Sequence, residues 1–423
     1  MSASSGESAQ QMVDHLFRHE AGKMIAVLTR IFGFHNLELV EDTVQETFLK
    51  ALQVWKFNAV PDNPSAWLMQ VARNRTIDLI RRQQKLVDIS GELLHRIQSD
   101  TENTIQQFFL DTEIADSQLR MIFTCCHPAL SPEDQVALTL KTVSGFGVQE
   151  IARALVSTDA AVQKRLYRAK EYIRTNEVRF EIPQGPALAE RLETVYTVLY
   201  LLFNEGYSSL KADELIRHDL CAEAMRLCKL LTEHKVGAKP STFALLALMC
   251  FQASRFDSRI GEDNNIILLE DQDRSKWDRE LIGLGYHFLN QSSTGDYLSV
   301  YHIESAIAAE HCMAPDFAST NWHALLKLYN YLLERKPIPI VRLNRSVILA
   351  MTDGVETAID TILDIPDITE LVNRHSTYAI VLGDLYGKAG NKAESRRLLQ
   401  KAYDLTPSLA EKKLLQEKLA AIR

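Results

Sequence analysis

Apolar residues recur every three or four positions in one segment after another of this chain of 423 residues. This spacing places them on a single face of a helix, whereas a half-buried strand would alternate apolar and polar positions. Beyond Pro183 no stretch of any length alternates, and clusters of Gly, Pro, Asn and Asp separate the periodic segments. The pattern therefore predicts an all-α protein, with helices in its second half over residues 188–203, 213–233, 242–255, 276–289, 300–312, 322–335 and 341–351.

Residues 131–175 predict two helices joined by a tight turn, the second of them strongly basic. Residues 148–155 carry one apolar stripe, and Thr158 or Asp159 is placed to cap the next helix. The outward residues of that helix are an amide and several cations: Gln163, Lys164, Arg165, Arg168 and Lys170. In a helix-turn-helix unit, such side chains read base edges and neutralise phosphates in the major groove. A helical hairpin with a solvated basic face is the alternative.

Residues 39–55 predict an amphipathic helix with an acidic surface. Its apolar residues share one face, and Asp42, Gln45 and Glu46 share another. Such a surface suits a basic partner. Residues 61–65 then form a turn, in which Ser65 is the expected cap of the following helix.

The helix predicted over residues 66–85 mixes cations with an aromatic and small polar groups. Trp67, Asn74 and Asp78 lie close to one helical line, and the cations are Arg73, Arg75, Arg81, Arg82 and Lys85. This mixture suits a surface that stacks unpaired bases and holds phosphates. A core tryptophan beside a solvated basic helix is the alternative.

These motifs, in this order, resemble a bacterial sigma factor of the extracytoplasmic-function class over about the first 180 residues. The resemblance rests on EDTVQETFLKAL, PSAWLMQVARNRTIDLIRR, SPEDQVALTLKTVSGFGVQEIARAL and RLYRAK. It implies a protein that is not an enzyme and needs no cofactor or metal. Its partners would be core RNA polymerase, contacted at the β′ clamp and the β flap, and promoter DNA.

The resemblance also assigns individual residues. Core-polymerase binding falls on Asp42, Gln45, Glu46 and Leu49. The −10 element would be melted and held by the loop 61–65 together with Trp67, Arg73, Asn74, Asp78, Arg81 and Arg82. The −35 element would be read by Gln163, Lys164, Arg165 and Arg168. Unstacking a base costs a few kcal/mol, which a capturing pocket offsets, so promoter opening requires no catalytic group.

Four parts are expected along the chain. They are sigma region 2 at residues 10–86, an acidic flexible linker at 87–116, sigma region 4 with its helix-turn-helix at 117–178, and a helical extension at 183–423. An acidic run such as the linker is usually a solvated segment. In the resembled family it would thread the polymerase channel used by the RNA.

The extension carries its clearest repeat near the C-terminus. The spacing of a tetratricopeptide motif is matched by Leu382, Gly383, Tyr386, Gly390, Leu399, Ala402 and Pro407, with Ser395 where Ala is usual. One such unit cannot bury its own apolar face, so further helix pairs must stack on it. We expect a tetratricopeptide-like solenoid. Its likeness to the extension of a subgroup of these sigma factors implies that it regulates or supports sigma activity, through an unknown protein or an intramolecular partner.

Composition changes this picture only in detail. The net charge of −8 argues against a nucleic-acid binder, yet residues 1–180 hold 20 basic and 22 acidic side chains, so the deficit lies mostly downstream. There is no apolar run of 18 residues and no charged-then-apolar leader, so we expect a cytoplasmic protein with no membrane partner. The six cysteines form no CxxC pair, and reduced thiols are expected.

Two clusters invite other chemistry. The run Cys125-Cys126-His127 has metal-ligand types, but no second cysteine pair is evident to close a tetrahedral site. The carboxylates between Glu270 and Asp273 could be metal ligands or an acid–base pair, although Arg274 and Lys276 beside them are ready ion-pair partners. An ordered loop is the preferred interpretation, with Arg274 and Trp277 forming a domain contact or with Trp277 in the core. A DNA-binding regulator or scaffold that does not engage polymerase is the second functional hypothesis, and an enzyme using these carboxylates is the third.

Overall fold

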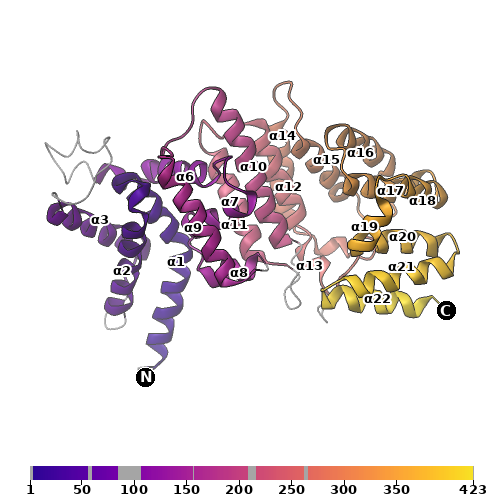
Figure 1. Ribbon diagram of the computed structural model, residues 1–423, viewed down its shortest axis with the longest axis horizontal. Helices are drawn as coiled ribbons and strands as arrows, with labels where there is room; N and C mark the ends of the chain where they lie inside the picture. Colours follow the sequence, from indigo (N-terminus) through magenta and orange to yellow (C-terminus); the bar gives the residue numbers. More distant parts are fainter. Residues whose placement is uncertain are drawn as a thin grey trace. The chain divides into compact units, whose positions relative to one another are not determined.

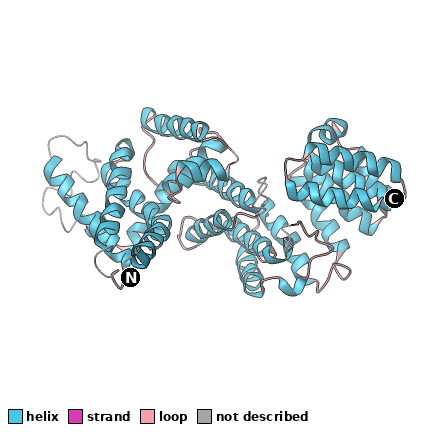
Figure 2. Ribbon diagram, turned by 90° about the horizontal axis from the view of Figure 1, so that it is seen from below, coloured by secondary structure: helices cyan, strands magenta, loops and turns pink. Residues whose placement is uncertain are grey.

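The structure is a computed structural model that describes residues 3–55, 60–83, 106–155, 157–207, 216–261 and 265–422. Within these ranges the chain is helical, and the only extended pairing is one isolated antiparallel bridge between Ile260 and Ile266 (Figure 2). The prediction of an all-α protein is confirmed. The chain divides into two compact units, Met1–Leu201 and Leu202–Arg423 (Figure 1). None of the described helices is both long and apolar enough to cross a membrane.

The first unit is built around its N-terminal helix, α1 (Ala3–Phe32), which contacts α2, α3, α6 and α7. The other elements of this unit are η1 (Phe34–Asn36), α2 (Leu37–Trp55), α3 (Pro64–Gln83), α6 (Asp111–Cys125), α7 (Pro132–Thr142), α8 (Val148–Ala154), α9 (Asp159–Thr175) and the larger part of α10 (Pro186–Tyr207). The last two turns of the described α1 bury nearly every side chain, because helices cover several of its faces. The apolar side chains in this part of α1 are therefore buried within the unit.

Helix α1 makes a very close backbone contact with the end of α7. A Cβ added at Gly22 would lie only 1.8 Å from the backbone oxygen of Val143. Farther along α1, the Arg30 guanidinium donates to Glu113 at 2.7 Å and lies 3.2 Å from Asp116, both on α6. The helices that follow residue 105 are thus packed directly onto the N-terminal helices within this unit.

Helix caps explain where α3 and α9 begin. The side chain of Asn63 accepts the amide of Ala66 at 3.0 Å, so α3 begins at Pro64 and the expected cap at Ser65 is wrong. Both residues have side chains that can cap, and Pro64 fits the first helical position because it has no amide hydrogen to satisfy. For α9 the choice left open is resolved in favour of Thr158, whose hydroxyl accepts the amide of Ala161 at 3.2 Å.

Part of the segment expected to be a flexible linker is helical. Residues 84–105 lie outside the described ranges, but Asp111, Glu113 and Asp116 belong to the first turns of α6. Acidic side chains are favourable there because the N-terminus of a helix carries partial positive charge. Two of these carboxylates also pair with Arg30, so they contribute to packing.

The second unit continues from α10 as a series of helices joined by turns and by longer loops (Figure 1). They are α11 (His218–Thr232), α12 (Pro240–Ala253), α13 (Phe256–Arg259), η2 (Arg274–Lys276), α14 (Arg279–Ser292), α15 (Val300–Met313), α16 (Trp322–Arg335), α17 (Pro339–Thr352), α18 (Val355–Leu363), α19 (Ile368–Arg374), α20 (Ser376–Lys388), α21 (Lys392–Leu405) and α22 (Leu409–Ala421). Helix α12 is buried along almost its whole length because α11, α14 and α15 pack around it.

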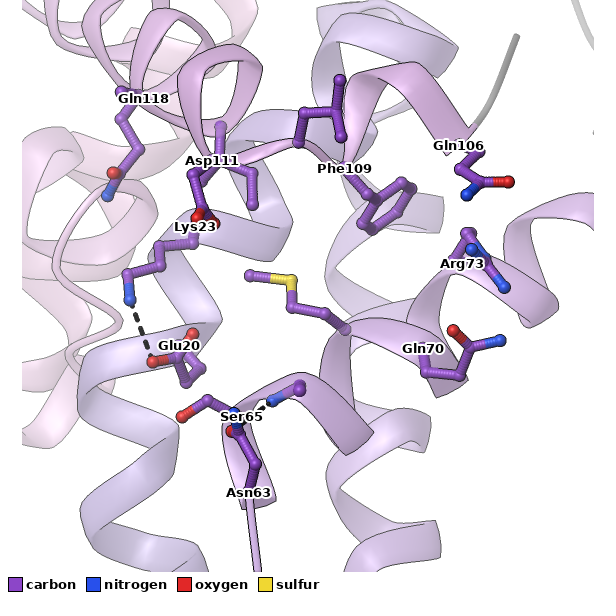
Figure 3. Close-up of a pocket in the computed structure, with 15 residues that line it drawn as sticks. Glu20, Lys23, Asn63, Ser65, Gln70, Arg73, Gln106, Phe109, Asp111 and Gln118 are labelled. Atoms are coloured by element: carbon purple, nitrogen blue, oxygen red, sulfur yellow. Dashed lines mark hydrogen bonds and ion pairs between the residues drawn. The ribbon is translucent and has the colours of Figure 1, made fainter. Parts of the chain in front are cut away.

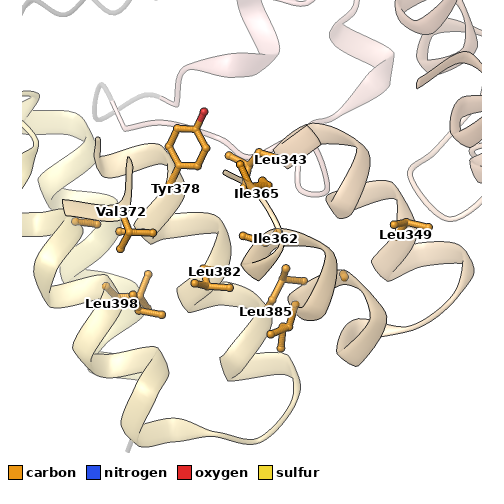
Figure 4. Packing of buried hydrophobic residues seen from close by; sticks show 14 of the residues in the cluster. Leu343, Leu349, Ile362, Ile365, Val372, Tyr378, Leu382, Leu385 and Leu398 are labelled. Carbon is orange, nitrogen blue, oxygen red and sulfur yellow. The ribbon is translucent and has the colours of Figure 1, made fainter. Parts of the chain in front are cut away.

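The C-terminal helices share one apolar cluster, drawn in Figure 4. Leu343 of α17, Ile362 of α18 and Leu382 of α20 are among its buried members. Helices α20 and α21 approach closely at Gly383, where an added Cβ would lie 3.0 Å from Leu399. Helix pairs of this kind agree with the stacking that the repeat pattern requires, and the tetratricopeptide assignment itself stays a prediction.

The segment 268–278 is an ordered loop ending in a helix cap. Asp278 accepts the amides of Glu280 and Leu281 at the start of α14. Trp277 is 2% exposed and Arg274 is 5% exposed within the second unit, so Trp277 is a core residue, the second of the two alternatives. Asp273 is occupied in capping η2 through Ser275. No group of three potential metal ligands occurs in the described ranges, here or at Cys125.

Candidate nucleic-acid interface

Helix α9 presents the polar face that the sequence predicts. Its buried stripe consists of Val162, Leu166, Ala169 and Ile173. Gln163, Lys164 and Arg168 are exposed, whereas Arg165 and Lys170 are half-buried. The side chains of Gln163 and Lys164 make no hydrogen bond within the described ranges. Helix α8 precedes α9 and contacts it, and the two together have the order of a helix-turn-helix unit.

Two cations of α9 are already engaged by carboxylates. Arg168 donates to Asp134 of α7 at 2.9 Å, and Lys170 lies 3.0 Å from both carboxylate oxygens of Glu41 on α2. The first pair orients Arg168 while leaving about half of its side chain exposed. The second ties the basic helix to α2, which the sequence pattern did not predict. Lys170 therefore serves as a packing contact in this arrangement.

Helix α2 presents the expected acidic surface. Asp42, Gln45, Glu46 and Leu49 are all exposed. The apolar face opposite them is buried, with Val40 and Ala51 completely inaccessible. Leu49, 56% exposed, adds an apolar side chain to this acidic surface. Glu46 forms an ion pair with Arg75 of α3, so one member of the acidic surface is linked to the neighbouring basic helix.

A cavity of about 570 Å³ opens beside the start of α3 (Figure 3). Asn63, Ser65, Gln70 and Arg73 line one side of it. The other walls come from Glu20 and Lys23 of α1 and from Gln106, Phe109, Asp111 and Gln118. In Figure 3, Gln106 and Phe109 lie across the cavity from Asn63 and Ser65. The sequence patterns did not predict this wall, because residues 106–118 were assigned to the linker and its junction with region 4.

The cavity is rich in hydrogen-bonding groups. The Nε of Arg73 is buried and has no hydrogen-bond partner among the described residues, and Lys23 is held by Glu20 at 2.9 Å. Phe109 adds an aromatic ring to this polar lining. An aromatic surface flanked by amides, a hydroxyl and a guanidinium can stack a planar heterocycle and bond to its edge.

The other residues of the predicted −10 surface differ in how exposed they are. Trp67 is half-buried, and its ring packs against that of Trp55 with the centroids 5.3 Å apart. Asn74 and Asp78 are exposed, and Asn74 accepts a bond from Gln70 at 3.2 Å. The side chains of Arg81 and Arg82 lie outside the described part of the chain.

Cys125 and Cys126 are packing residues. Both are completely buried, and burial raises the pKa of Cys125 to about 12, partly offset by a contact of 3.1 Å with the Thr142 hydroxyl. The pKa of Cys126 is raised further by burial and by the adjacent Cys125. Neutral buried thiols are poor nucleophiles and poor metal ligands.

Comparison with known proteins identifies the family to which the first unit belongs. Residues 16–86 match the family model of sigma-70 region 2, and residues 120–173 match that of sigma-70 region 4. The ECF RNA polymerase sigma factor SigM of Bacillus subtilis is 30% identical over 137 residues, which cover 32% of this chain and 78% of SigM. The chain belongs to the extracytoplasmic-function class of the sigma-70 family. This sigma factor is a transcription initiation factor rather than an enzyme, and it acts with core RNA polymerase and promoter DNA.

Other relatives show how much of the chain is similar to known proteins. The ECF sigma factor BldN of Streptomyces coelicolor is 27% identical over 133 residues, 30% of this chain and 47% of BldN. An uncharacterized protein of Rhizobium meliloti is 35% identical over 378 residues, 89% of this sigma factor and 88% of that protein. Residues 191–293 match a family of unknown function, DUF6596, so the extension is shared with other proteins. No solved structure matches the chain.

Proposed function

We propose that this sigma factor recognises a promoter through two surfaces of its first unit, with α2 docked on the β′ clamp of the polymerase and region 4 on the β flap. The exposed polar face of α9 reads the −35 element, and the cavity beside α3 receives an unstacked base of the −10 element. The observation that carries this proposal is the lining of that cavity. Asn63, Ser65 and Arg73 line a space of about 570 Å³, which is large enough for a planar base.

The −35 surface has the chemistry needed for base readout. Gln163 can form two hydrogen bonds with adenine, and Arg168 two with guanine. Lys164 and Arg165 are placed to neutralise phosphates. The pair between Arg168 and Asp134 holds the guanidinium in a fixed orientation, which favours a bidentate contact.

The −10 surface combines capture with charge. A flipped base loses stacking worth a few kcal/mol, and hydrogen bonds to Asn63, Ser65 and Gln70 with stacking on Phe109 offset that loss. Asn74 and Asp78 extend the polar surface along α3, with Arg73 beside them. Arg81 and Arg82 follow on the same helix and are assigned to phosphates from their position in the sequence.

The polymerase surface combines acidic groups with an exposed leucine. Asp42, Gln45, Glu46 and Leu49 stand clear of the packed face of α2. A rim of charges around one apolar side chain is a common arrangement in protein interfaces. The extension supports or restrains this activity, as its family resemblance implies, with a partner that is a protein or another part of the same chain.

Run-off transcription with core polymerase tests the promoter assignments. Gln163→Ala should reduce initiation by about tenfold and relax the preference at one −35 base, since a bidentate base contact is worth roughly 1–3 kcal/mol. Lys164→Ala should instead weaken DNA binding uniformly and reduce its salt dependence by about one counterion. Lys229→Ala, on an exposed ion-paired lysine of the second unit, is the matched control. Full activity and unchanged base preference in the Gln163 variant would contradict the −35 assignment.

The role of the extension requires a truncation with its own control. A chain ending at Ile182 should differ from the full chain in transcript yield if the extension regulates activity. That truncation also removes Arg191, which donates to the backbone oxygen of Phe123 at 2.7 Å inside the first unit. Arg191→Gln in the full chain reports the effect of losing this contact alone. Equal yields from the truncated and full chains would remove the regulatory role.

A further inference from the structure

A second cavity, of about 410 Å³, lies within the second unit. Its volume falls in the range of about 300–1,000 Å³ that is usual for small-molecule sites. Three aromatic side chains form part of its wall, Phe317, Trp322 and Tyr329, and the ring centroids of the first two are 4.8 Å apart. The loop 268–270 and helices α12, α15, α17 and α20 supply the rest. The ordered loop that follows Ile267 therefore contributes directly to a cavity.

Two guanidinium groups lie at or near this cavity: Arg255 is half-buried and lines it, whereas Arg274 is buried close by and does not line it. Arg255 lines it and donates to the amide oxygen of Gln272 at 3.2 and 3.1 Å. Arg274, 5% exposed, donates to backbone oxygens of His311 and Ala314 at 2.7 and 2.8 Å. Neither arginine forms an ion pair with a carboxylate in the described part of the chain. A buried cation such as Arg274 is costly unless an anion compensates it, and the half-buried Arg255 adds a second positive charge at the cavity itself.

Both arginines also contact the ring of Trp277. Their guanidinium carbons lie 5.2 and 5.0 Å from the ring centroid of Trp277, which is 2% exposed. The Nε of Arg274 is buried and makes no hydrogen bond. Stacking on one indole satisfies a part of their surface but leaves both charges uncompensated.

The positive charges of the two arginines also affect the pKa of His311. It lines the cavity, is 9% exposed, and its Nδ1 has no hydrogen-bond partner in the part of the chain that the structure describes. Burial, followed by the positive charges of Arg255 and Arg274, lowers the pKa of His311 to about 3. The imidazole is therefore neutral near pH 7, and its Nδ1 can donate a hydrogen bond in one tautomer. Gln252, also in the lining, has a buried side-chain oxygen without a partner.

The acidic groups around the cavity are engaged elsewhere. Glu270 at the rim lies 3.7 Å from Lys388, and that pair is neutral overall. Glu304, near Tyr329, is bonded to Lys336 at 3.2 Å. Asp316 has an electrostatic effect on Arg274 and accepts a hydrogen bond from the Ser319 hydroxyl. The lining therefore carries a net positive charge facing an apolar, aromatic space.

We propose that this cavity binds a small organic anion, a carboxylate carried on an aromatic or otherwise apolar body. The carboxylate would lie against Arg255 and the unpartnered nitrogen of His311. The body would pack on Trp322, Phe317 and Tyr329. Charge-assisted hydrogen bonds with Arg255 supply affinity for the carboxylate, and burial of the body against the aromatic walls adds hydrophobic stabilisation. This site is independent of the promoter-reading surfaces, so its test does not depend on transcription.

Titration calorimetry on the full chain with a matched pair of probes provides the test. Indole-3-acetate and indole-3-acetamide share one body and differ in charge, and benzoate and phenylacetate extend the series to smaller bodies. We expect the carboxylates to bind and the amide to bind at least about tenfold more weakly. Arg255→Gln should abolish that difference, whereas Arg374→Gln, on an exposed arginine paired with Glu370, should preserve it.

Two further measurements keep the result clear if Arg255→Gln folds poorly. Met351→Trp fills the cavity from a lining residue that is 41% exposed, and it should weaken every probe without altering charge. Carboxylate binding should also raise the pKa of His311 in NMR titrations, because the bound anion offsets the two guanidiniums. The proposal is overturned if no carboxylate binds up to about 10 mM, a free energy of only about −3 kcal/mol, or if acid and amide bind equally.

Discussion

Replacing Gly22 by alanine tests the close contact between α1 and the end of α7. The added Cβ would lie 1.8 Å from the backbone oxygen of Val143 and 2.6 Å from its backbone carbon. Neither atom can rotate away as a side chain would. To restore ordinary contact at about 3.5 Å, the two backbones would have to separate by roughly 1.5 Å.

The sign of the effect follows from two opposing terms. Alanine is better than glycine inside a helix by about 1 kcal/mol. Overpacking of a close-packed contact costs roughly 1–3 kcal/mol, and more when backbone must move. We therefore expect a net loss of about 1–2 kcal/mol, which loosens α1 from α7. Gly283→Ala in α14 is the matched control, because nothing lies within 4 Å of its added Cβ, and it should stabilise its helix.

Native-state hydrogen exchange on the full chain measures both effects locally. Amides of α1 and α7 should exchange about 5- to 30-fold faster in Gly22→Ala, the ratio that corresponds to 1–2 kcal/mol. Amides of α14 should exchange more slowly in Gly283→Ala. If Gly22→Ala instead slows exchange in α1 and α7, as the control does in α14, the helices are not in backbone contact and the reasoning fails.

Three further outcomes are expected. Thr158→Ala removes the hydroxyl that caps α9 and should destabilise its first turn by about 1 kcal/mol, seen as faster exchange at Ala161, while Thr158→Ser should not. Cys125, with its pKa near 12, should resist iodoacetamide in the folded chain at pH 8. Because an unfolded thiol ionises near pH 8.5, stability should also fall from about pH 8.5 to 12, and an unchanged urea midpoint there would contradict this. His311, with its pKa near 3, remains neutral when folded but is protonated below about pH 6.5 when unfolded. The free energy of unfolding of the second unit should therefore decrease as the pH is lowered from about 6.5 to 3, by up to about 1.4 kcal/mol per pH unit. In unfolding followed by tryptophan fluorescence, His311→Gln should make this pH dependence weaker.

Local periodicity was sufficient for the elements and faces that depend on neighbours in sequence. The predicted helix 322–335 coincides with α16 (Trp322–Arg335), and the outward residues of α9 follow from its buried stripe. The cap at Asn63 was missed because the turn 61–65 holds more than one residue able to cap, and boundaries depend on geometry that sequence does not fix.

Contacts between distant segments could not be predicted by these means. Glu41 and Lys170 are 129 residues apart, and either one reads as a solvated charge within its own helix. The role of residues 106–118 in the cavity beside α3 depends on how α6 packs on α1. The burial of Arg274 is likewise invisible in sequence, where the adjacent carboxylate Asp273 suggested a surface ion pair.

The ion pair between Glu46 and Arg75 has one member on the helix assigned to polymerase and the other on the helix assigned to DNA. A polymerase cation that takes Glu46 releases Arg75, whose guanidinium can then neutralise a phosphate. By thermodynamic linkage the exchange is reciprocal, so DNA held at Arg75 strengthens polymerase binding by the same factor. Exposed pairs are worth at most about 1 kcal/mol, which limits that factor to about fivefold. On the proposed assignments, the two binding events would cooperate modestly through a single surface contact, without any change of fold.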